Sequence, residues 1–307
     1  MDEQRREPPD NENEDQAPES DPQLSLWPSE PLAASPGPSA EHVGDWVPIS
    51  DIPPSPPEAA PERIKEPPWS LEDLVAFILF AFLSFVFANL AVLFVISILR
   101  QRFAWHITIQ QALTQTPWVV SMQTGWELLW LGFIYLTVSK KYHRRFWEAL
   151  KWVRTPHSAV GFLIAGAAVA FVAQLIFNLF PSQKHLPIEK LFSSPESAYL
   201  LALFGILVAP FVEELVFRGF FYPVFEQRWG FAAAVLLTAL LFAGIHIPQL
   251  SGGWEEIASI FFVGAVFSYC RGKTGSLIPP FLMHLAYNTA LFVSLYVSTD
   301  RFRNLKG

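Results

Sequence analysis

Long apolar stretches separated by short polar loops limit the folds that are open to this chain. A helix needs about 20 mostly apolar residues to cross a bilayer. With 51% hydrophobic residues, 28 phenylalanines and 11 tryptophans, the chain is too apolar for an ordinary soluble enzyme. The sequence therefore predicts an all-α, polytopic transmembrane helical bundle of about seven or eight spans. The apolar stretches lie at residues 74–99, 118–138, 159–180, 199–221, 231–247, 257–270 and 277–297.

The charge is segregated along the chain. Up to Asp73 there are 18 acidic and 4 basic residues, whereas 10 acidic and 17 basic residues follow. Residues 1–68 also hold 16 of the 26 prolines, so this part cannot bury enough apolar surface to offset its ordering entropy. We expect a disordered, acidic, proline-rich tail over residues 1–70, N-terminal transmembrane helices over residues 71–197, and a functional core over residues 198–298.

The basic loop at residues 140–154 indicates the orientation in the membrane. It holds six lysines and arginines against one acid, and such loops stay on the cytoplasmic side. Counting helices from this loop places the acidic tail, Arg228 and Arg271 on the same side, whereas Arg100 and Arg102 fall on the opposite side, against the rule. The sequence predicts a multi-pass integral membrane protein with a cytoplasmic tail.

Ionisable residues inside the apolar stretches are the first candidates for function. Placing one at bilayer depth costs at least about 2.5 kcal/mol, so its presence calls for a reason. Of the seven histidines, only His246 and His284 lie in apolar stretches. The other polar groups of the core are Glu213, Glu214, Arg218 and Asn288.

Counting residues brings several of these groups together. If the chain turns at residues 226–231, Glu213 precedes the turn by 13 residues and His246 follows it by 15. At about 1.5 Å per residue, both then lie roughly 20 to 22 Å from the turn, at similar depth. His284 and Asn288 are four residues apart and share one helix face.

The two adjacent glutamates are expected to have different roles. Glu214 and Arg218 are four residues apart with the acid first, the favourable order for an ion pair. Glu213 points about 100° away and lacks a charge partner in its helix. A carboxyl group beside imidazoles can activate water, and a histidine with an amide can hold an oxyanion. Each group also has a structural explanation, such as helix capping by His246 or interhelical bonding by Asn288. Their joint occurrence favours a functional site.

Other residue patterns narrow the chemistry. The single cysteine, Cys270, excludes an internal disulfide and a cysteine-based zinc site. No H-E-x-x-H helix and no G-x-S-x-G element is present. Glu127, a further acid in an apolar stretch, is interpreted as a packing residue in preference to a proton-relay group.

Three short segments in order resemble a known family. They are "EELVFR" at residues 213–218, "FAGIH" at 242–246 and "HLAYN" at 284–288. They match the motifs E-E-x-x-x-R, F-x-x-x-H and H-x-x-x-N of the CPBP family, also called the Abi family. This family contains the type II CAAX prenyl proteases and the bacteriocin-processing or immunity proteins. The resemblance covers residues 198–297, about a third of the chain.

The resemblance implies an intramembrane endopeptidase with a CPBP-like protease core. By motif position, Glu213 would be the general base that activates water, with assistance from His246. His284 and Asn288 would stabilise the tetrahedral oxyanion. The substrate would be a membrane-associated protein or peptide, and its prenylation is left open because no residue pattern here indicates a lipid site.

The resemblance also bears on cofactors and on the remaining motif residues. Glu214 and Arg218 would be structural neighbours that hold the motif. The family has been described as metalloproteases, and Glu213, His246 and His284 with a water would suit an open zinc site. The sequence does not decide between zinc and a Glu/His mechanism without metal, and we favour the latter slightly.

The expected partners are the lipid bilayer and a membrane-anchored or amphipathic peptide, with no nucleic acid and an unidentified partner for the tail. The alternative to an enzyme is a non-catalytic membrane scaffold or bacteriocin-immunity protein. A transporter with a proton relay is a weaker alternative, since inverted repeats would place polar residues in both halves.

Overall fold

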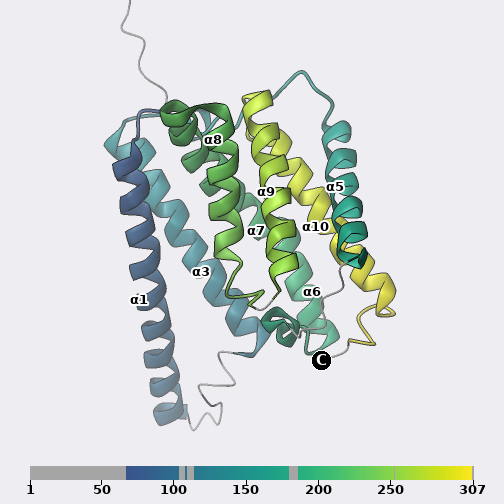
Figure 1. Ribbon diagram of the computed structural model, residues 1–307. Helices are drawn as coiled ribbons and strands as arrows, with labels where there is room; N and C mark the ends of the chain where they lie inside the picture. Colours follow the sequence, from purple (N-terminus) through teal and green to yellow (C-terminus); the bar gives the residue numbers. More distant parts are fainter. Residues whose placement is uncertain (1–66, 104–107, 109–113, 180–185, 252, 306–307) are drawn as a thin grey trace, which may run out of the picture. The chain divides into compact units, whose positions relative to one another are not determined.

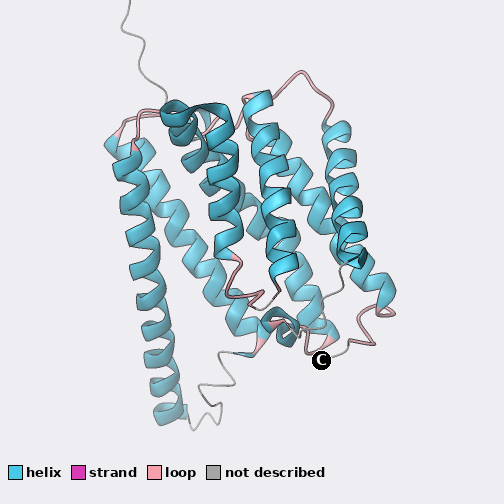
Figure 2. Ribbon diagram, in the orientation of Figure 1, coloured by secondary structure: helices cyan, strands magenta, loops and turns pink. Residues whose placement is uncertain are grey.

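The computed structural model describes residues 67–103, 108, 114–179, 186–251 and 253–305 (Figure 1). Within these ranges the ordered elements are all helices, with no strand, so the predicted all-α class is confirmed (Figure 2). The predicted disordered tail lies almost entirely outside the described residues. The principal helices are α1 (Leu71–Phe103), α3 (Thr116–Tyr135), α5 (Ala159–Leu179), α6 (Pro195–Leu203), α7 (Ala209–Glu213), α8 (Tyr222–Ile245), α9 (Trp254–Thr274) and α10 (Ile278–Ser298). Shorter elements are η2 (Leu136–Lys141), α4 (Phe146–Ala149), η3 (Pro187–Leu191), η4 (Phe204–Val208) and η5 (Glu214–Phe221).

All seven predicted apolar stretches fall on helices, and the chain is an integral membrane protein. Four helical segments are long and apolar enough to cross a membrane: Leu71–Arg102, Ala159–Ile176, Pro195–Ile245 and Ile278–Ser298. The third of these contains two of the predicted stretches. Two other predicted spans, α3 and α9, fall short of that criterion. In α9 the reason is physical, since acidic residues occupy its first turn and basic residues its last turn.

The start of α1 is fixed to the basic loop by Asp73. The Glu72 backbone N–H donates to Ser70 Oγ at 3.3 Å, and the Ser70 N–H donates to Asp73 Oδ2 at 3.0 Å, which is a reciprocal helix cap. Asp73 also accepts from Lys141 Nζ at 2.6 Å and from the Tyr142 hydroxyl at 2.7 Å. The hydrogen bond to Asp73 raises the pKa of Lys141. Beside α1, the helix α3 lies along it (Figure 1).

A break inside α8 reverses the chain. Gly230 has φ 83° and ψ 174°, a conformation that suits glycine because it has no Cβ. After this break α8 packs back along η5, and the rings of Phe217 and Phe242 meet at 5.5 Å between centroids. Gly230 lies within the predicted turn at residues 226–231. The far end of α8 therefore returns to the depth of α7.

The segment η5 is a π-helix, and all eight of its residues are buried. A π-turn leaves backbone carbonyls without their ordinary helical partners, and such turns are frequent at functional sites. Two side chains from distant elements satisfy carbonyls here. Trp69 Nε1 donates to the Phe220 carbonyl at 2.8 Å, and Arg271 Nε donates to the Arg218 carbonyl at 3.0 Å. These contacts fix the segment that follows Glu213.

The helix α10 lies along α5 and also contacts α9 (Figure 1). The approach to α5 is close because Gly166 faces the backbone of Met283, where a Cβ would collide with the Met283 carbonyl. Small residues at such contacts let membrane helices pack tightly. The position of α10, and with it that of His284, therefore depends on Gly166.

Candidate active site

The buried ion pair of Arg218 and Glu214 forms the base of the site. Both side chains are fully buried, and Arg218 Nη1 lies 3.0 Å from Glu214 Oε1. The guanidinium also donates from Nη2 to the Gly264 carbonyl at 3.0 Å and from Nε to Ser268 Oγ at 3.3 Å. These bonds join η5 to α9, and the guanidinium stacks over the Phe242 ring at 4.4 Å. Because each of its three nitrogens donates a hydrogen bond and Glu214 balances its charge, Arg218 can hold that charge away from water.

Glu214 also orients His284. The Nδ1 atom of His284 lies 2.9 Å from Glu214 Oε1, the same oxygen that accepts from Arg218. A carboxylate oxygen accepts, so Nδ1 carries the proton in this arrangement. The opposite ring nitrogen, Nε2, is then directed toward Glu213.

Glu213 faces the two imidazoles from the end of α7. Its Oε2 lies 3.7 Å from His284 Nε2, and its Oε1 lies 4.0 Å from His246 Nε2. His246 Nδ1 lies 2.8 Å from the Phe242 carbonyl, which can only accept, so this ring also carries its proton on Nδ1. Three acceptor groups therefore converge, and a water molecule is a donor that would suit them.

These groups line a cavity of about 310 Å³ among α3, α6–α8, α9 and α10. Its polar lining consists of Gln123, Glu127, Glu213, His246, Gln249, His284, Tyr287 and Asn288. Apolar residues of η3, η4 and α10 form much of the remainder. Ligand sites commonly combine an apolar lining with a few convergent polar groups. A wider hollow of about 1080 Å³ exists elsewhere, but none of the motif residues lines it.

Asn288 is in the cavity but is also used for packing. Its Nδ2 donates to the Gly205 carbonyl at 2.6 Å, which lies in the π-helical segment η4. A side-chain amide nitrogen has two N–H groups, so one donor is left over. The structure thus brings Asn288 into the same cavity as Glu213, and its role as an oxyanion donor stays a prediction.

Glu127 was interpreted as a packing residue from the sequence, and the structure places it in the cavity. Its Oε1 accepts from Gln123 Nε2 at 2.9 Å, whereas Oε2 is buried without a hydrogen-bond partner among the described residues. The sequence contained one sign of this position. No basic residue lies within four residues of Glu127, so the acid has no ion-pair partner in its own helix. Trp69 and Arg271, which satisfy η5 carbonyls, carried no such local signal.

The donor types suit zinc, but their spacing does not. Ligands about 2.0–2.1 Å from a tetrahedral zinc ion lie roughly 3.3 Å from one another. The separations from Glu213 to the imidazoles are 3.7 and 4.0 Å. Among the residues that the structure describes, no group of three or more His, Cys, Asp or Glu is placed to hold a metal ion. Zinc was left open by the sequence, with a slight preference for a reaction without metal, and that preference stays a prediction.

Comparison with known proteins shows which family the segment that contains these residues is similar to. Residues 195–290 match the family described as "Type II CAAX prenyl endopeptidase Rce1-like". The match covers about a third of the chain, so it is a likeness of this segment to the Rce1-like family. All six motif residues lie inside the Rce1-like segment, including the buried pair, both histidines and Asn288. The predicted resemblance to CAAX proteases is thereby confirmed at the level of the family.

The chain is also similar to proteins whose names state no activity. The chain is 31% identical to an "Uncharacterized 24.3 kDa protein" of Escherichia coli over 132 residues, which are 42% of this chain and 56% of that protein. It is 24% identical to the "UPF0177 protein YbdI" of Lactococcus lactis subsp. lactis (strain IL1403) over 139 residues, 44% of this chain and 73% of that protein. No solved structure matches the chain.

Proposed function

We propose that the protein is an intramembrane endopeptidase in which Glu213 activates water for attack on a peptide bond. The observation that carries this proposal is the convergence of Glu213, His246 and His284 on one cavity, from three separate helices. The Rce1-like family of the segment supports the reaction class. Peptide hydrolysis needs a base, a positioned water and donors for an oxyanion, and the cavity holds side chains suited to each role.

In the proposed reaction, a water molecule hydrogen-bonds to Glu213 and to His246 Nε2. Glu213 removes a proton as the water oxygen attacks the carbonyl carbon of the peptide bond. The negative charge that forms on the carbonyl oxygen is held by the remaining N–H of Asn288. His284, whose Nδ1 lies 2.9 Å from Glu214 Oε1, would be a second donor to this carbonyl oxygen in the form that carries a proton on Nε2. Glu213 then returns the proton to the amine nitrogen as the C–N bond breaks.

The lining of the cavity supports an apolar, membrane-associated peptide as the substrate. Phe192, Phe204, Leu291 and Phe292 contribute to the walls, so apolar side chains would be accommodated there. We propose that the substrate is a membrane-anchored or amphipathic peptide. Identification of the substrate would show whether it is prenylated.

The test compares protein N-termini in membranes of cells that express the wild type or Glu213→Gln. Glutamine is nearly isosteric but cannot act as a base, and loss of a general base lowers rates about 10²–10⁴-fold. The matched control is Glu255→Gln, which makes the same change at an exposed carboxylate. We expect termini that occur with wild type and with Glu255→Gln and disappear with Glu213→Gln. Identical termini in all three, at equal protein levels, would refute hydrolysis.

A non-catalytic scaffold is the second candidate, and one observation favours it. The bonds from Glu214 to His284 and from Asn288 to the Gly205 carbonyl join different helices, as packing contacts would. A scaffold predicts that Glu213→Gln keeps the biological function, because that substitution leaves both contacts in place.

A further inference from the structure

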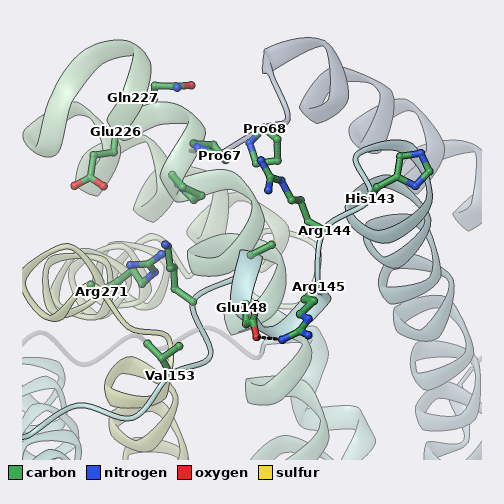
Figure 3. Close-up of a pocket in the computed structure, with 14 residues that line it drawn as sticks. Pro67, Pro68, His143, Arg144, Arg145, Glu148, Val153, Glu226, Gln227 and Arg271 are labelled. Atoms are coloured by element: carbon green, nitrogen blue, oxygen red, sulfur yellow. Dashed lines mark hydrogen bonds and ion pairs between the residues drawn. The ribbon is translucent and has the colours of Figure 1, made fainter. Parts of the chain in front are cut away.

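A second hollow, which none of the motif residues lines, lies at the basic end of the helices (Figure 3). Its volume is about 1080 Å³. Figure 3 shows part of its walls: Arg144, Arg145 and Glu148 come from the segment around α4, and Arg271 comes from the last turn of α9. The lining also includes Pro67, Pro68, His143, Ala149, Lys151, Val153, Pro223, Glu226, Gln227 and Gly275. We name this hollow the basic pocket.

Cations exceed acids in the lining of the basic pocket. Four basic side chains line it, namely Arg144, Arg145, Lys151 and Arg271, against two acids, Glu148 and Glu226. Each acid already has a partner. Glu148 Oε1 lies 3.0 Å from Arg145 Nη1, and Glu226 Oε1 accepts from the Tyr222 hydroxyl at 2.9 Å.

Two of the arginines keep donors for a ligand. Within the described residues, the Arg144 guanidinium makes no hydrogen bond or ion pair, and the residue is half-buried against the pocket. Arg271 is 5% exposed, and its Nε is the atom that donates to the Arg218 carbonyl. A guanidinium has five N–H donors, so four remain on its two terminal nitrogens. Each of these two guanidinium groups therefore has open donors that suit the oxygens of a phosphate.

The surroundings of the pocket place it at the surface of the bilayer. Trp147, next to the pocket residue Glu148, is 49% exposed, and the pocket residue Val153 is 40% exposed. Tryptophan at the end of membrane helices is typical of the headgroup level. Basic pockets between transmembrane helices at that level bind anionic headgroups.

We propose that the basic pocket is a binding site for a phosphate-bearing anion, with Arg144 and Arg271 as its principal ligands. An anionic phospholipid headgroup and a free phosphate share this chemistry. The site does not depend on the proposed peptide hydrolysis. It is nevertheless linked to the motif by bonds, because Arg271 holds the Arg218 carbonyl and Arg218 holds Glu214. A ligand in the pocket should therefore stabilise the folded core.

The experiment measures the thermal unfolding midpoint of the full chain in a non-ionic detergent while a probe is added. The probes are dihexanoyl-phosphatidylglycerol, dihexanoyl-phosphatidylcholine and inorganic phosphate. A ligand that binds only the folded state raises the midpoint in a concentration-dependent manner, which yields an apparent Kd. We expect a saturable rise with the phosphatidylglycerol and none with the zwitterionic phosphatidylcholine.

Matched variants separate a built site from general surface charge. Arg144→Ala removes a pocket arginine whose side chain bonds to none of the described residues, whereas Arg154→Ala removes an exposed arginine of the same loop that does not line the pocket. We expect Arg144→Ala to weaken binding about tenfold or more and Arg154→Ala to leave it within about twofold. Glu213→Gln should bind as the wild type does, so that a failure of hydrolysis leaves this result intact.

Each outcome decides the proposal. Saturable binding of inorganic phosphate with the same Arg144 dependence supports the site and assigns its source to a free anion. Binding of the phosphatidylglycerol alone assigns it to lipid. Absence of any saturable rise, or an equal weakening by Arg144→Ala and Arg154→Ala, would overturn the proposal.

Discussion

Replacement of Arg218 by methionine tests whether the buried ion pair holds the motif together. Methionine occupies a similar volume but has no charge and no donor. In the structure it would remove the partner of Glu214 at 3.0 Å and the donor to the Gly264 carbonyl at 3.0 Å. Glu214 would then be a fully buried carboxylate whose nearest remaining donor is His284.

The expected loss of stability follows from these contacts. Breaking a buried ion pair from one side costs about 3–5 kcal/mol, because it leaves an uncompensated charge. The unpaired Gly264 carbonyl adds roughly 1 kcal/mol. We therefore expect Arg218→Met to lower the free energy of unfolding by about 4–6 kcal/mol. The double variant Glu214→Gln with Arg218→Met removes the stranded charge, and we expect it to recover at least about 2 kcal/mol.

The assay is unfolding by SDS in mixed micelles, followed by tryptophan fluorescence. Arg228→Met serves as the control, since Arg228 is exposed and the same substitution there should change stability by less than about 0.5 kcal/mol. A loss below about 1 kcal/mol for Arg218→Met would refute the argument. So would a double variant that is less stable than Arg218→Met alone.

Three further predictions concern packing, the π-helix and metal. Gly166→Ala should lower the free energy of unfolding by about 1–3 kcal/mol in the same SDS titration, because a Cβ would meet the α10 backbone. The control is Gly161→Ala on the same helix, where the nearest neighbour of a Cβ would lie at 3.9 Å. That substitution should be neutral or stabilising. Trp69→Phe should lower the free energy of unfolding by about 1–3 kcal/mol, because it leaves the Phe220 carbonyl of the π-helix unpaired. It should also speed amide hydrogen exchange in η5, and unchanged exchange there would contradict this prediction. Cleavage of a substrate found by comparing N-termini should persist after dialysis against 1,10-phenanthroline, and a loss that zinc restores would contradict the metal-free reaction.

Much of the architecture could be predicted from local patterns. The apolar stretches predicted every principal helix, because helix length and hydropathy are encoded within about 20 residues. The spacing of Glu214 and Arg218 predicted their ion pair, which the structure shows with both side chains fully buried. Counting residues on both sides of the turn placed Glu213 and His246 at one depth, and Gly230 within that turn explains why the count works.

What the sequence did not reveal depends on contacts between distant segments. The π-helical form of η5 is stabilised by Trp69 and Arg271, which lie 151 and 53 residues from the carbonyls they satisfy. No periodicity in the sequence indicates such pairs. The position of Glu127 in the cavity likewise follows from how α3 packs, since burial alone is compatible with a packing role.

Two adjacent residues, Glu213 and Glu214, divide two tasks between them: one holds the framework together and the other presents a carboxyl group to the cavity. Glu214 is held by Arg218 and His284 and belongs to the framework, whereas Glu213 faces the cavity and bonds to nothing that the framework needs. One substitution at Glu213 would therefore give a protein that folds, keeps its cavity and can still hold a peptide without cutting it. If the proposed peptidase activity is present, a single substitution would thus convert the protein into one that binds a peptide without cleaving it.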